Sequence, residues 1–315
     1  MYNKQRARGA FVVGTRASAL ALAQTELVVA ALRKAHPGRT FLIQHVSTNG
    51  DHDQRTPLTE LGGQGIFVKE IENALLAGEV DLAVHSLKDM PTAQPEGLLL
   101  GAVLPREDPR DALISRHGLN LDDLPPGARV GTGSLRRQAQ LRAYRRDLEV
   151  VGLRGNVDTR LRKAAGPDYD AVILALAGLI RLGRASEVTA VLPLDVMLPA
   201  MGQGAIGVEV RADDAEALAL VAPLDDAPTR AATAAERSLL RELGGGCHVP
   251  IAAHALLQGG QLWLRGLVAS PTGERIVRGS ATAPPERAEA LGRELARQLL
   301  QQGCRELLRE EAGRA

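Results

Sequence analysis

The chain has 315 residues, 45% of them hydrophobic and 24% charged, which is the composition of an ordinary globular protein with room for two or three domains. A net charge of +1 and an aromatic content of 2% argue against a general binder of nucleic acids or membrane surfaces, since these need a basic excess or stacking rings. Only two cysteines, no apolar run of roughly 18 residues and no signal-like N-terminus predict a soluble, cytoplasmic protein without a membrane partner.

Short apolar runs alternate with segments of helical period in the first hundred residues. This pattern is typical of β-α-β units and largely parallel sheets. The predicted strands cover residues 11–14, 41–46 and 81–85. The predicted helices cover residues 18–35 and about 67–78, the second with one apolar face.

The same alternation restarts after residues 105–109. It predicts strands over 128–131, 148–151 and 171–174, and helices over 134–144 and 156–164. Val13-Gly14-Thr15 and Val130-Gly131-Thr132 open the two halves alike, each followed by a serine and a helix. The sequence therefore predicts two α/β lobes of related build.

A third region begins near Asp225. A helix over about 228–243 leads into a glycine loop that holds Cys247, and a closing helix over about 285–308 ends the pattern. Between them the sequence predicts three strands, which we expect to be antiparallel because glycine and proline turns separate them. The strands cover residues 249–257, 261–269 and 275–281. This region is predicted to be an α+β domain.

Basic residues gather in the second lobe. A run of arginines is usually the solvated face of a helix, and this interpretation stays open. However, Arg136-Arg137 and Arg154 follow strand-to-helix turns, where backbone N–H groups and the helix dipole favour an anion. We therefore expect several guanidinium groups at the carboxyl ends of neighbouring strands to form a pocket for carboxylates or phosphates. The basic run as a whole consists of Arg136, Arg137, Arg142, Arg145, Arg146, Arg154, Arg160, Arg162 and Lys163.

The first lobe offers a matching rim. Arg16 and Ser18 follow its first predicted strand, and glycine loops lie at 48–51 and 62–65. Neither loop fits a P-loop or a dinucleotide fingerprint, so ATP binding and hydride transfer have no support. Lys88-Asp89 follows the strand over 81–85. The two residues either form a surface salt bridge, or the Asp89 carboxylate stabilises a cation formed from an acidic substrate.

Cys247 lies among glycines, where a thiol is accessible and could carry a group covalently. The alternative is a small apolar filler, as free cysteine usually is. The seven histidines are scattered, and no residues show the spacing of a metal site. No order of serine, histidine and aspartate indicates a hydrolytic triad.

Eight stretches together resemble the hydroxymethylbilane synthase family, also called porphobilinogen deaminase. They occur in the family's order and cover about residues 10–255. The stretches are GTRASALALAQ (14–24), GIFVKEIE (65–72), HSLKDMP (85–91), REDPRDA (106–112), GTGSLRRQ (131–138), LRGNVDTR (153–160), LPAMGQGA (198–205) and GGCHVP (245–250).

The resemblance implies a transferase of tetrapyrrole and haem biosynthesis. Cys247 would carry a dipyrromethane cofactor through a thioether, and porphobilinogen units would be added with loss of ammonia until four are joined. Hydrolysis would then release hydroxymethylbilane. The resemblance makes Asp89 the catalytic residue, and it assigns cofactor binding to Cys247, Lys88, Ser134, Arg136, Arg137, Arg154, Gly155, Asn156 and Arg160. Substrate binding falls to Arg16, Ser18, Gln24, Ser86 and Gln203.

The resemblance also implies an architecture: two periplasmic-binding-protein-like lobes joined by two crossovers, near 105–109 and 199–204, and a C-terminal α+β domain with a three-stranded sheet. Domain 1 would take residues 1–104 and 205–222, domain 2 residues 110–198 and domain 3 residues 227–315. A self-contained site predicts a monomer.

Three positions depart from the family's usual pattern: Gln64 stands in place of lysine, Gly133 of serine and His248 of glutamine. Gln64 loses a charge, so we expect no carboxylate-binding role there. Cys304 lies outside every motif and is expected to be structural. The competing function is a non-catalytic, two-lobed protein that binds small carboxylic acids without a reactive sulfur.

Overall fold

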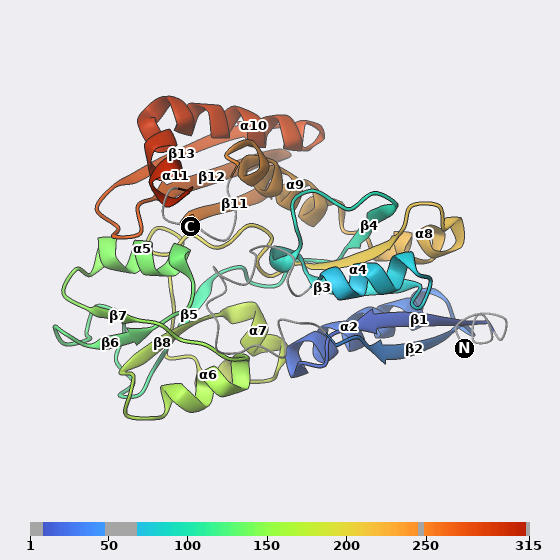
Figure 1. The fold of residues 1–315 in the computed structure, drawn as a ribbon, viewed down its shortest axis with the longest axis horizontal. Helices are drawn as coiled ribbons and strands as arrows, with labels where there is room; N and C mark the ends of the chain where they lie inside the picture. The colour runs from blue at the N-terminus through green and yellow to red at the C-terminus, as the bar shows by residue number, and fades with distance from the viewer. Residues whose placement is uncertain (1–8, 48–67, 245–248, 313–315) are drawn as a thin grey trace. The chain divides into compact units, whose positions relative to one another are not determined.

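A computed structural model describes residues 9–47, 68–244 and 249–312 (Figure 1). The glycine loops at 48–51 and 62–65 and Cys247, the predicted site of cofactor attachment, lie outside the described residues. The chain divides into two compact units, Met1–Arg106 with Ala205–Arg230, and Glu107–Gly204 with Ala231–Ala315. This division does not separate the C-terminal part from the second lobe, and the three-domain boundaries stay a prediction.

The first unit is built on a five-stranded sheet. Its order is β2 (Thr40–His45), β1 (Ala10–Thr15), β3 (Leu82–Ser86), β10 (Ile206–Arg211) and β4 (Leu98–Val103). β2, β1 and β3 are parallel, as predicted, but β10 runs antiparallel to both of its neighbours. The expectation of a largely parallel sheet missed β10, because this strand enters after the chain has crossed to the other unit and returned.

Helices cover both faces of this sheet. Phe11 and Val13 point to the face where α2 (Ala19–Ala35) and α8 (Ala215–Val221) pack. Val12 points to the opposite face, against α4 (Lys69–Leu76). Successive residues of a strand alternate between faces, so one apolar run serves two layers.

A second five-stranded sheet lies in the other unit. Its order is β7 (Glu149–Val151), β6 (Arg129–Gly131), β8 (Ala171–Ala175), β5 (Asp111–Ser115) and β9 (Ala190–Val191). β7, β6 and β8 are parallel, and β5 is antiparallel to β8 and to β9.

The helices of the second lobe again lie on opposite faces of the sheet. Leu141 of α5 (Leu135–Tyr144) packs with Val130 and Ile173, whereas Leu161 of α6 (Val157–Ala164) packs with Val172. A short helix, α7 (Leu176–Arg181), follows β8. The two lobes therefore share a layered build, as the repeated Val-Gly-Thr pattern predicted.

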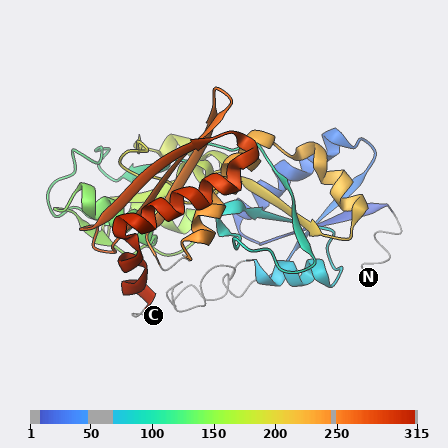
Figure 2. The same ribbon diagram turned by 90° about the horizontal axis from the view of Figure 1, so that it is seen from above.

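The C-terminal part is a three-stranded antiparallel sheet of β11 (Ile251–Gln258), β12 (Gln261–Ala269) and β13 (Ile276–Ala283). α9 (Ala227–Glu242) and α10 (Ala288–Leu299) share its apolar core, and Figure 2 shows α10 lying across the strands. One continuous closing helix was predicted, and this prediction is wrong. Gly303 has a φ of 94°, so the helix breaks before α11 (Arg305–Ala312).

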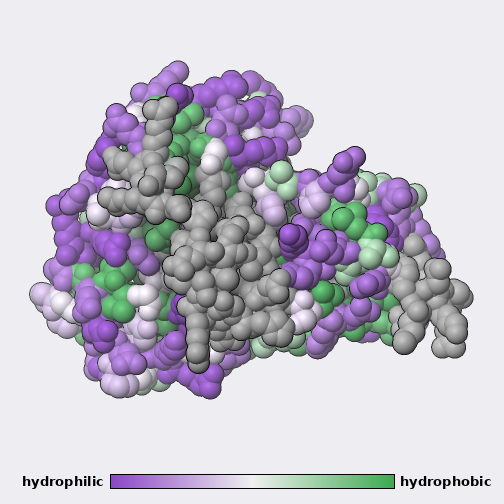
Figure 3. All heavy atoms as spheres, viewed as in Figure 1, coloured by the Kyte–Doolittle hydropathy of each residue, from purple (hydrophilic) through white to green (hydrophobic). Residues whose placement is uncertain are grey.

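The predicted fold class is confirmed: two α/β lobes with two chain crossovers between them and a three-stranded C-terminal sheet. On the face seen in Figure 3, hydrophilic residues dominate and apolar residues form small separate areas. In the described part of the chain, no helix has both the length and the apolarity to span a membrane.

Candidate active site

A short turn at the end of β3 presents the predicted catalytic carboxylate. The turn is a single 3-10 turn, Leu87–Asp89, and Asp89 is half-buried on it. Leu87 and Met90 on either side are 0% and 1% exposed, and the Leu87 N–H donates to the Ala205 carbonyl at 3.0 Å. Buried apolar anchors on both sides of Asp89 fix the position from which its side chain extends.

Gly207 of β10 packs against this turn. A Cβ built on Gly207 would lie 3.2 Å from both Leu87 Cδ1 and Met90 Sδ. Such contacts are tight, so the absence of a side chain at 207 allows the turn to approach the sheet closely.

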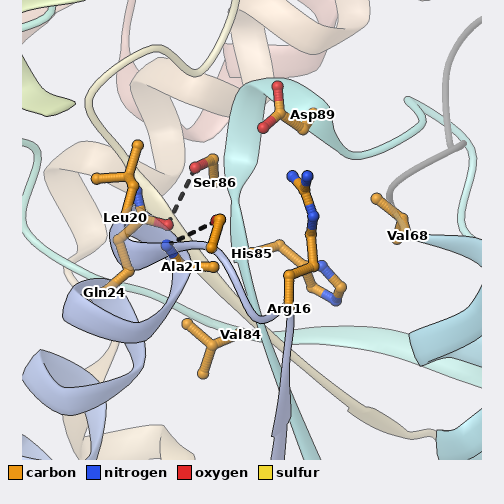
Figure 4. Close-up of a pocket in the computed structure, with 10 residues that line it drawn as sticks. Arg16, Leu20, Ala21, Gln24, Val68, Val84, His85, Ser86 and Asp89 are labelled. Atoms are coloured by element: carbon orange, nitrogen blue, oxygen red, sulfur yellow. Dashed lines mark hydrogen bonds between the residues drawn. The ribbon is translucent and has the colours of Figure 1, made fainter. Parts of the chain in front are cut away.

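Asp89 lines a pocket that has about 410 Å³ of free space, the part open to solvent included (Figure 4). The other lining residues come from the β1–α2 turn, α2, β3 and the residue before α4. They are Arg16, Ser18, Leu20, Ala21, Gln24, Val68, Val84, His85 and Ser86. The structure therefore brings together Asp89 and four of the five predicted substrate-binding residues.

The polar groups of the pocket have defined positions. Ser18 caps α2, since its Oγ accepts a hydrogen bond from the Ala21 N–H at 3.3 Å. Ser86 Oγ donates to Gln24 Oε1 at 3.0 Å, and Figure 4 shows the Arg16 guanidinium pointing toward Asp89. An arginine and a helix N-terminus favour bound anions, while the carboxylate favours a cation. The pocket can thus hold a molecule that carries both charges.

A second group of predicted residues forms a buried ion-pair cluster in the other unit. Arg136 Nη1 lies 2.8 Å from Asp111 Oδ2, and Arg137 Nη2 lies 2.7 Å from Asp111 Oδ1. We call these three residues the Asp111 cluster. The arginines are each 5% exposed and Asp111 is fully buried, so the interpretation as a solvated helix face is wrong for this pair.

Two further predicted residues hold the Asp111 cluster in place. Gln203 Nε2 donates to Asp111 Oδ1 at 2.8 Å, and Ser134 caps α5 by accepting from the Arg137 N–H. Burial alone would raise the pKa of Asp111, but the charges of Arg136 and Arg137 outweigh it and hold this pKa well below its usual range. Asp111 is therefore ionised between two cations, and the cluster has an excess of one positive charge.

The remaining predicted residues lie at the start of α6. Asn156 caps this helix, with its Oδ1 accepting from the Thr159 N–H at 2.9 Å, and Gly155 takes a positive φ of 115°. Arg160 Nε donates to the Gly155 carbonyl at 2.7 Å. Within the described ranges no hydrogen bond or ion pair engages the Arg154 guanidinium, which is half-exposed. Lys88 is half-buried beside Asp89 and does not line the pocket.

We expect Asp111→Asn to destabilise the protein by about 3–5 kcal/mol, because it leaves two buried guanidinium groups without a carboxylate. Urea denaturation of both proteins measures the change. The matched control is Asp147→Asn, which removes a carboxylate from an exposed pair with Arg145 and should change stability little. Equal effects of the two substitutions would contradict this account of the cluster.

The sequence analysis missed a buried group of titratable residues behind the pocket. Glu209 of β10 is 0% exposed, His85 is 5% exposed and Glu72 of α4 is 7% exposed. His85 Nε2 lies 3.4 Å from Glu209 Oε2, and Gln94 Nε2 donates to Glu209 Oε1 at 2.8 Å. A charged residue between apolar neighbours in one strand, as Glu209 is between Val208 and Val210, was the available signal.

Burial, followed by the negative charge of Glu209, raises the pKa of Glu72 above its ordinary value of 4.5, and His85 opposes this shift. When the pKa of a group is higher in the folded than in the unfolded state, its contribution to stability is fully present at pH values below the unfolded-state pKa. This contribution is lost as the pH rises through the folded-state pKa. Glu72→Gln does not titrate. We therefore expect the melting temperature of the variant, relative to wild type, to increase with pH from about 4.5 upward until Glu72 is ionised.

Melting temperatures measured across this range check the prediction for Glu72. Glu79→Gln removes an exposed carboxylate from the same lobe and serves as the control. The difference in melting temperature between this variant and wild type should not change with pH. If the melting-temperature difference between Glu72→Gln and wild type also did not change with pH, Glu72 would have its ordinary pKa in the folded protein.

Comparison with known proteins shows the family of the chain. Residues 11–219 match the family model described as porphobilinogen deaminase, dipyromethane cofactor binding domain, and residues 231–301 match its C-terminal domain. The porphobilinogen deaminase of Roseiflexus sp. (strain RS-1) is 52% identical over 297 residues, which cover 94% of this chain and 98% of that protein.

Similarity to solved structures outside the family is low. The VFT2 domain of Bordetella pertussis BvgS is 15% identical, with a TM-score of 0.41 over 70% of this chain and 88% of that one. The Salmonella typhimurium periplasmic binding protein STM4351 is 14% identical, with a TM-score of 0.37 over 68% and 91%. These likenesses say nothing about function, whereas the sequence matches extend over nearly the whole chain. The chain therefore belongs to the porphobilinogen deaminase family.

Proposed function

We propose that this chain is a porphobilinogen deaminase, also called hydroxymethylbilane synthase. It joins four porphobilinogen molecules one at a time, with loss of ammonia, onto a covalently bound dipyrromethane and releases hydroxymethylbilane by hydrolysis. The observation that carries the proposal is Asp89, held on a rigid turn in a pocket with Arg16, in a chain of this family. We further propose that it acts as a monomer in the cytoplasm without a nucleic-acid partner.

Asp89 is the proposed catalytic residue. When ammonia leaves the aminomethyl group of porphobilinogen, a positive charge develops on the pyrrole. A carboxylate fixed beside that charge stabilises it more than water would, because the turn has already oriented it. The pyrrole N–H is a suitable donor to the same carboxylate.

Residues around Asp89 would bind the acid side chains of the substrate. Arg16 offers a guanidinium fork, and Ser18 lies at the N-terminus of α2, where carboxylates are favoured. Ser86 and Gln24, which hydrogen-bond to each other, could exchange that bond for one to the substrate. Gln203 completes the proposed substrate-binding set, although its amide also donates to Asp111.

The second lobe contains donors that fit a dipyrromethane with acidic side chains. The Nε atoms of Arg136 and Arg137 are buried and have no hydrogen-bond acceptor among the described residues. Ser134 and Asn156 each begin a helix, where N–H groups favour anions. We propose that the cofactor is bound covalently by Cys247 and otherwise by Lys88, Ser134, Arg136, Arg137, Arg154, Gly155, Asn156 and Arg160. When bound, the cofactor supplies the pyrrole to which each new unit is joined.

Two measurements on one preparation test the proposal. Protein expressed in cells that make porphobilinogen should exceed its sequence mass, after denaturation, by two pyrrole units, and peptide mapping should place the addition on Cys247. The same protein should consume porphobilinogen and release ammonia. Protein at its bare sequence mass that binds small acids without turnover would instead support the non-catalytic binding protein.

A further inference from the structure

The turn between β12 and β13 lies directly on the backbone of α5. The turn is tight: Gly273 has a φ of 73° and donates its N–H to the Ser270 carbonyl at 2.9 Å, and the Ser270 N–H donates to the Arg275 carbonyl at 2.9 Å. A Cβ built on Gly273 would lie 2.4 Å from the Ala139 carbonyl oxygen and 2.8 Å from the Ala143 nitrogen. Helix backbone does not move aside as the end of a side chain does, so this contact requires glycine.

Arg142 of α5 binds the same turn. It belongs to the basic run of the second lobe, but its Nη1 donates to the Pro271 carbonyl at 2.7 Å. A hydrogen bond from a guanidinium is stronger than one between neutral groups. Apolar contacts lie on the same side of the helix, where Ala139 packs with Leu267 and Ala269 of β12. Three kinds of contact thus hold the C-terminal sheet on one helix of the second lobe.

The start of this helix carries the arginines of the Asp111 cluster. Arg136 lies three residues before Ala139, about 4.5 Å along the helix axis. Its Nη1 also donates to the Leu198 carbonyl at 2.6 Å, and Leu198 belongs to the same apolar cluster as Ala139. Because backbone hydrogen bonds tie successive turns of a helix together, a shift of α5 at its contact with the sheet also shifts Arg136 and Arg137.

The C-terminal sheet also follows the proposed attachment site in the chain. Cys247 precedes the first residue of β11 by four positions, and β11 pairs along its whole length with β12, which leads into the turn on α5. Arg136 and Arg137 are proposed to bind the acidic side chains of the group that Cys247 carries. The contact between the turn and α5 therefore joins the strand next to the tether to the helix that would bind the tethered group.

We infer that Gly273 and Arg142 are positioning residues, which hold the β12–β13 turn on α5 and so fix Arg136 and Arg137 for a pyrrole chain attached at Cys247. This inference rests on the proposed function. Neither positioning residue touches the reacting atoms. When the contact loosens, the tethered chain is held less accurately, and a misplacement of about 1 Å can slow a reaction by about 10²-fold. Each addition of porphobilinogen is then slower although the protein is folded.

Gly273→Ala tests the inference, and Gly260→Ala is its matched control. Gly260 lies in the β11–β12 turn with a φ of 76°, so alanine meets similar backbone strain there. Apart from its chain neighbours, no atom of the described residues lies within 4 Å of a Cβ built on Gly260. We expect Gly273→Ala to lower the rate constant for addition of porphobilinogen about tenfold, and Gly260→Ala to stay within about a factor of two of wild type.

Rapid mixing of cofactor-bearing protein with porphobilinogen, followed by acid quenching and intact mass, measures the first-order rate constant of each addition. Chains that have not folded contribute no product, so they lower the amplitude and leave the rate constant unchanged. A merely structural effect of Gly273→Ala would therefore reduce the amount of extended product at the wild-type rate, and this result would overturn the inference.

Arg142→Ala tests the same contact if Gly273→Ala does not fold. It removes the hydrogen bond to Pro271 without introducing a clash, and we expect the rate constant of addition to fall about fivefold. Arg142→Lys keeps a cationic donor and should restore most of the rate. An Arg142→Ala protein that adds porphobilinogen at the wild-type rate would overturn the positioning role of this side chain.

Hydrogen exchange followed by mass spectrometry reports on α5 in the cofactor-bearing protein without substrate. The amides of α5 should exchange faster in Gly273→Ala than in wild type or Gly260→Ala, whereas those of α2 should not change. Unchanged exchange in α5 overturns the inference. If wild type consumes porphobilinogen and Gly273→Ala adds it at the wild-type rate, only the inference fails. If wild type does not consume porphobilinogen, the proposed function fails, and the exchange of α5 still decides whether the turn holds this helix.

Discussion

Cys247→Ser is expected to leave the purified protein at its bare sequence mass and to abolish turnover of porphobilinogen. A hydroxyl is a far weaker nucleophile than a thiol, because almost none of it is ionised near neutral pH. Without the covalent primer there is no pyrrole on which the product can grow. Intact mass and ammonia release from the same sample measure both effects.

Cys304→Ala is the matched control for Cys247→Ser. Cys304 is the other cysteine of the sequence, it is fully buried, and burial raises the pKa of its thiol, which makes it a poor nucleophile. We expect this variant to carry the modification and to remain active. A modified, active Cys247→Ser protein would remove the assignment of the attachment site.

Asp89→Asn is expected to lower kcat by about 10²–10⁴-fold, the range found when a fixed electrostatic or proton-accepting group is removed. The substitution keeps the size of the side chain, and buried Leu87 and Met90 hold the turn in place, so folding and cofactor attachment should be retained. Single-turnover measurements with porphobilinogen give the rate, and intact mass gives the state of the cofactor.

Glu96→Gln is the charge-matched control for Asp89→Asn. Glu96 is exposed in the loop that follows the same turn, and its side chain does not line the pocket. Its removal should leave the rate near that of wild type. Near-normal turnover of Asp89→Asn would exclude Asp89 from stabilising the positive charge on the substrate.

Local features of the fold could be predicted from the sequence because they depend on neighbours in the chain. Ser18, Ser134 and Asn156 begin their helices as expected, since each side chain caps N–H groups only three residues away. The parallel strands β1 to β3 were also found, because apolar runs between helices are a local pattern. Arg16, Ser18 and Asp89 were named from their places after predicted strands, whereas Gln24 and Ser86 were named only through the family resemblance.

Features that depend on distant pairing were missed. Asp111 and Arg136 are brought together by a strand and a helix from different parts of the second lobe, so no short sequence pattern shows that the arginine is buried. The contact between His85 and Glu209 likewise depends on β10 lying beside β3. Gly303 lies in a segment with helical periodicity, and its positive φ interrupts the helix between α10 and α11, where leucine spacing suggested continuation.

The place of β10 in the first sheet has a consequence for synthesis on the ribosome. β10 lies between β3 and β4, yet it follows β4 in the chain by about a hundred residues, which include the whole second sheet. A nascent chain that has emerged only as far as residue 204 has all the other strands of this sheet but two unpaired edges where β10 belongs. Exposed edges of this kind invite pairing with other chains. The second lobe can thus complete its sheet before the first, and a truncated N-terminal fragment is expected to aggregate.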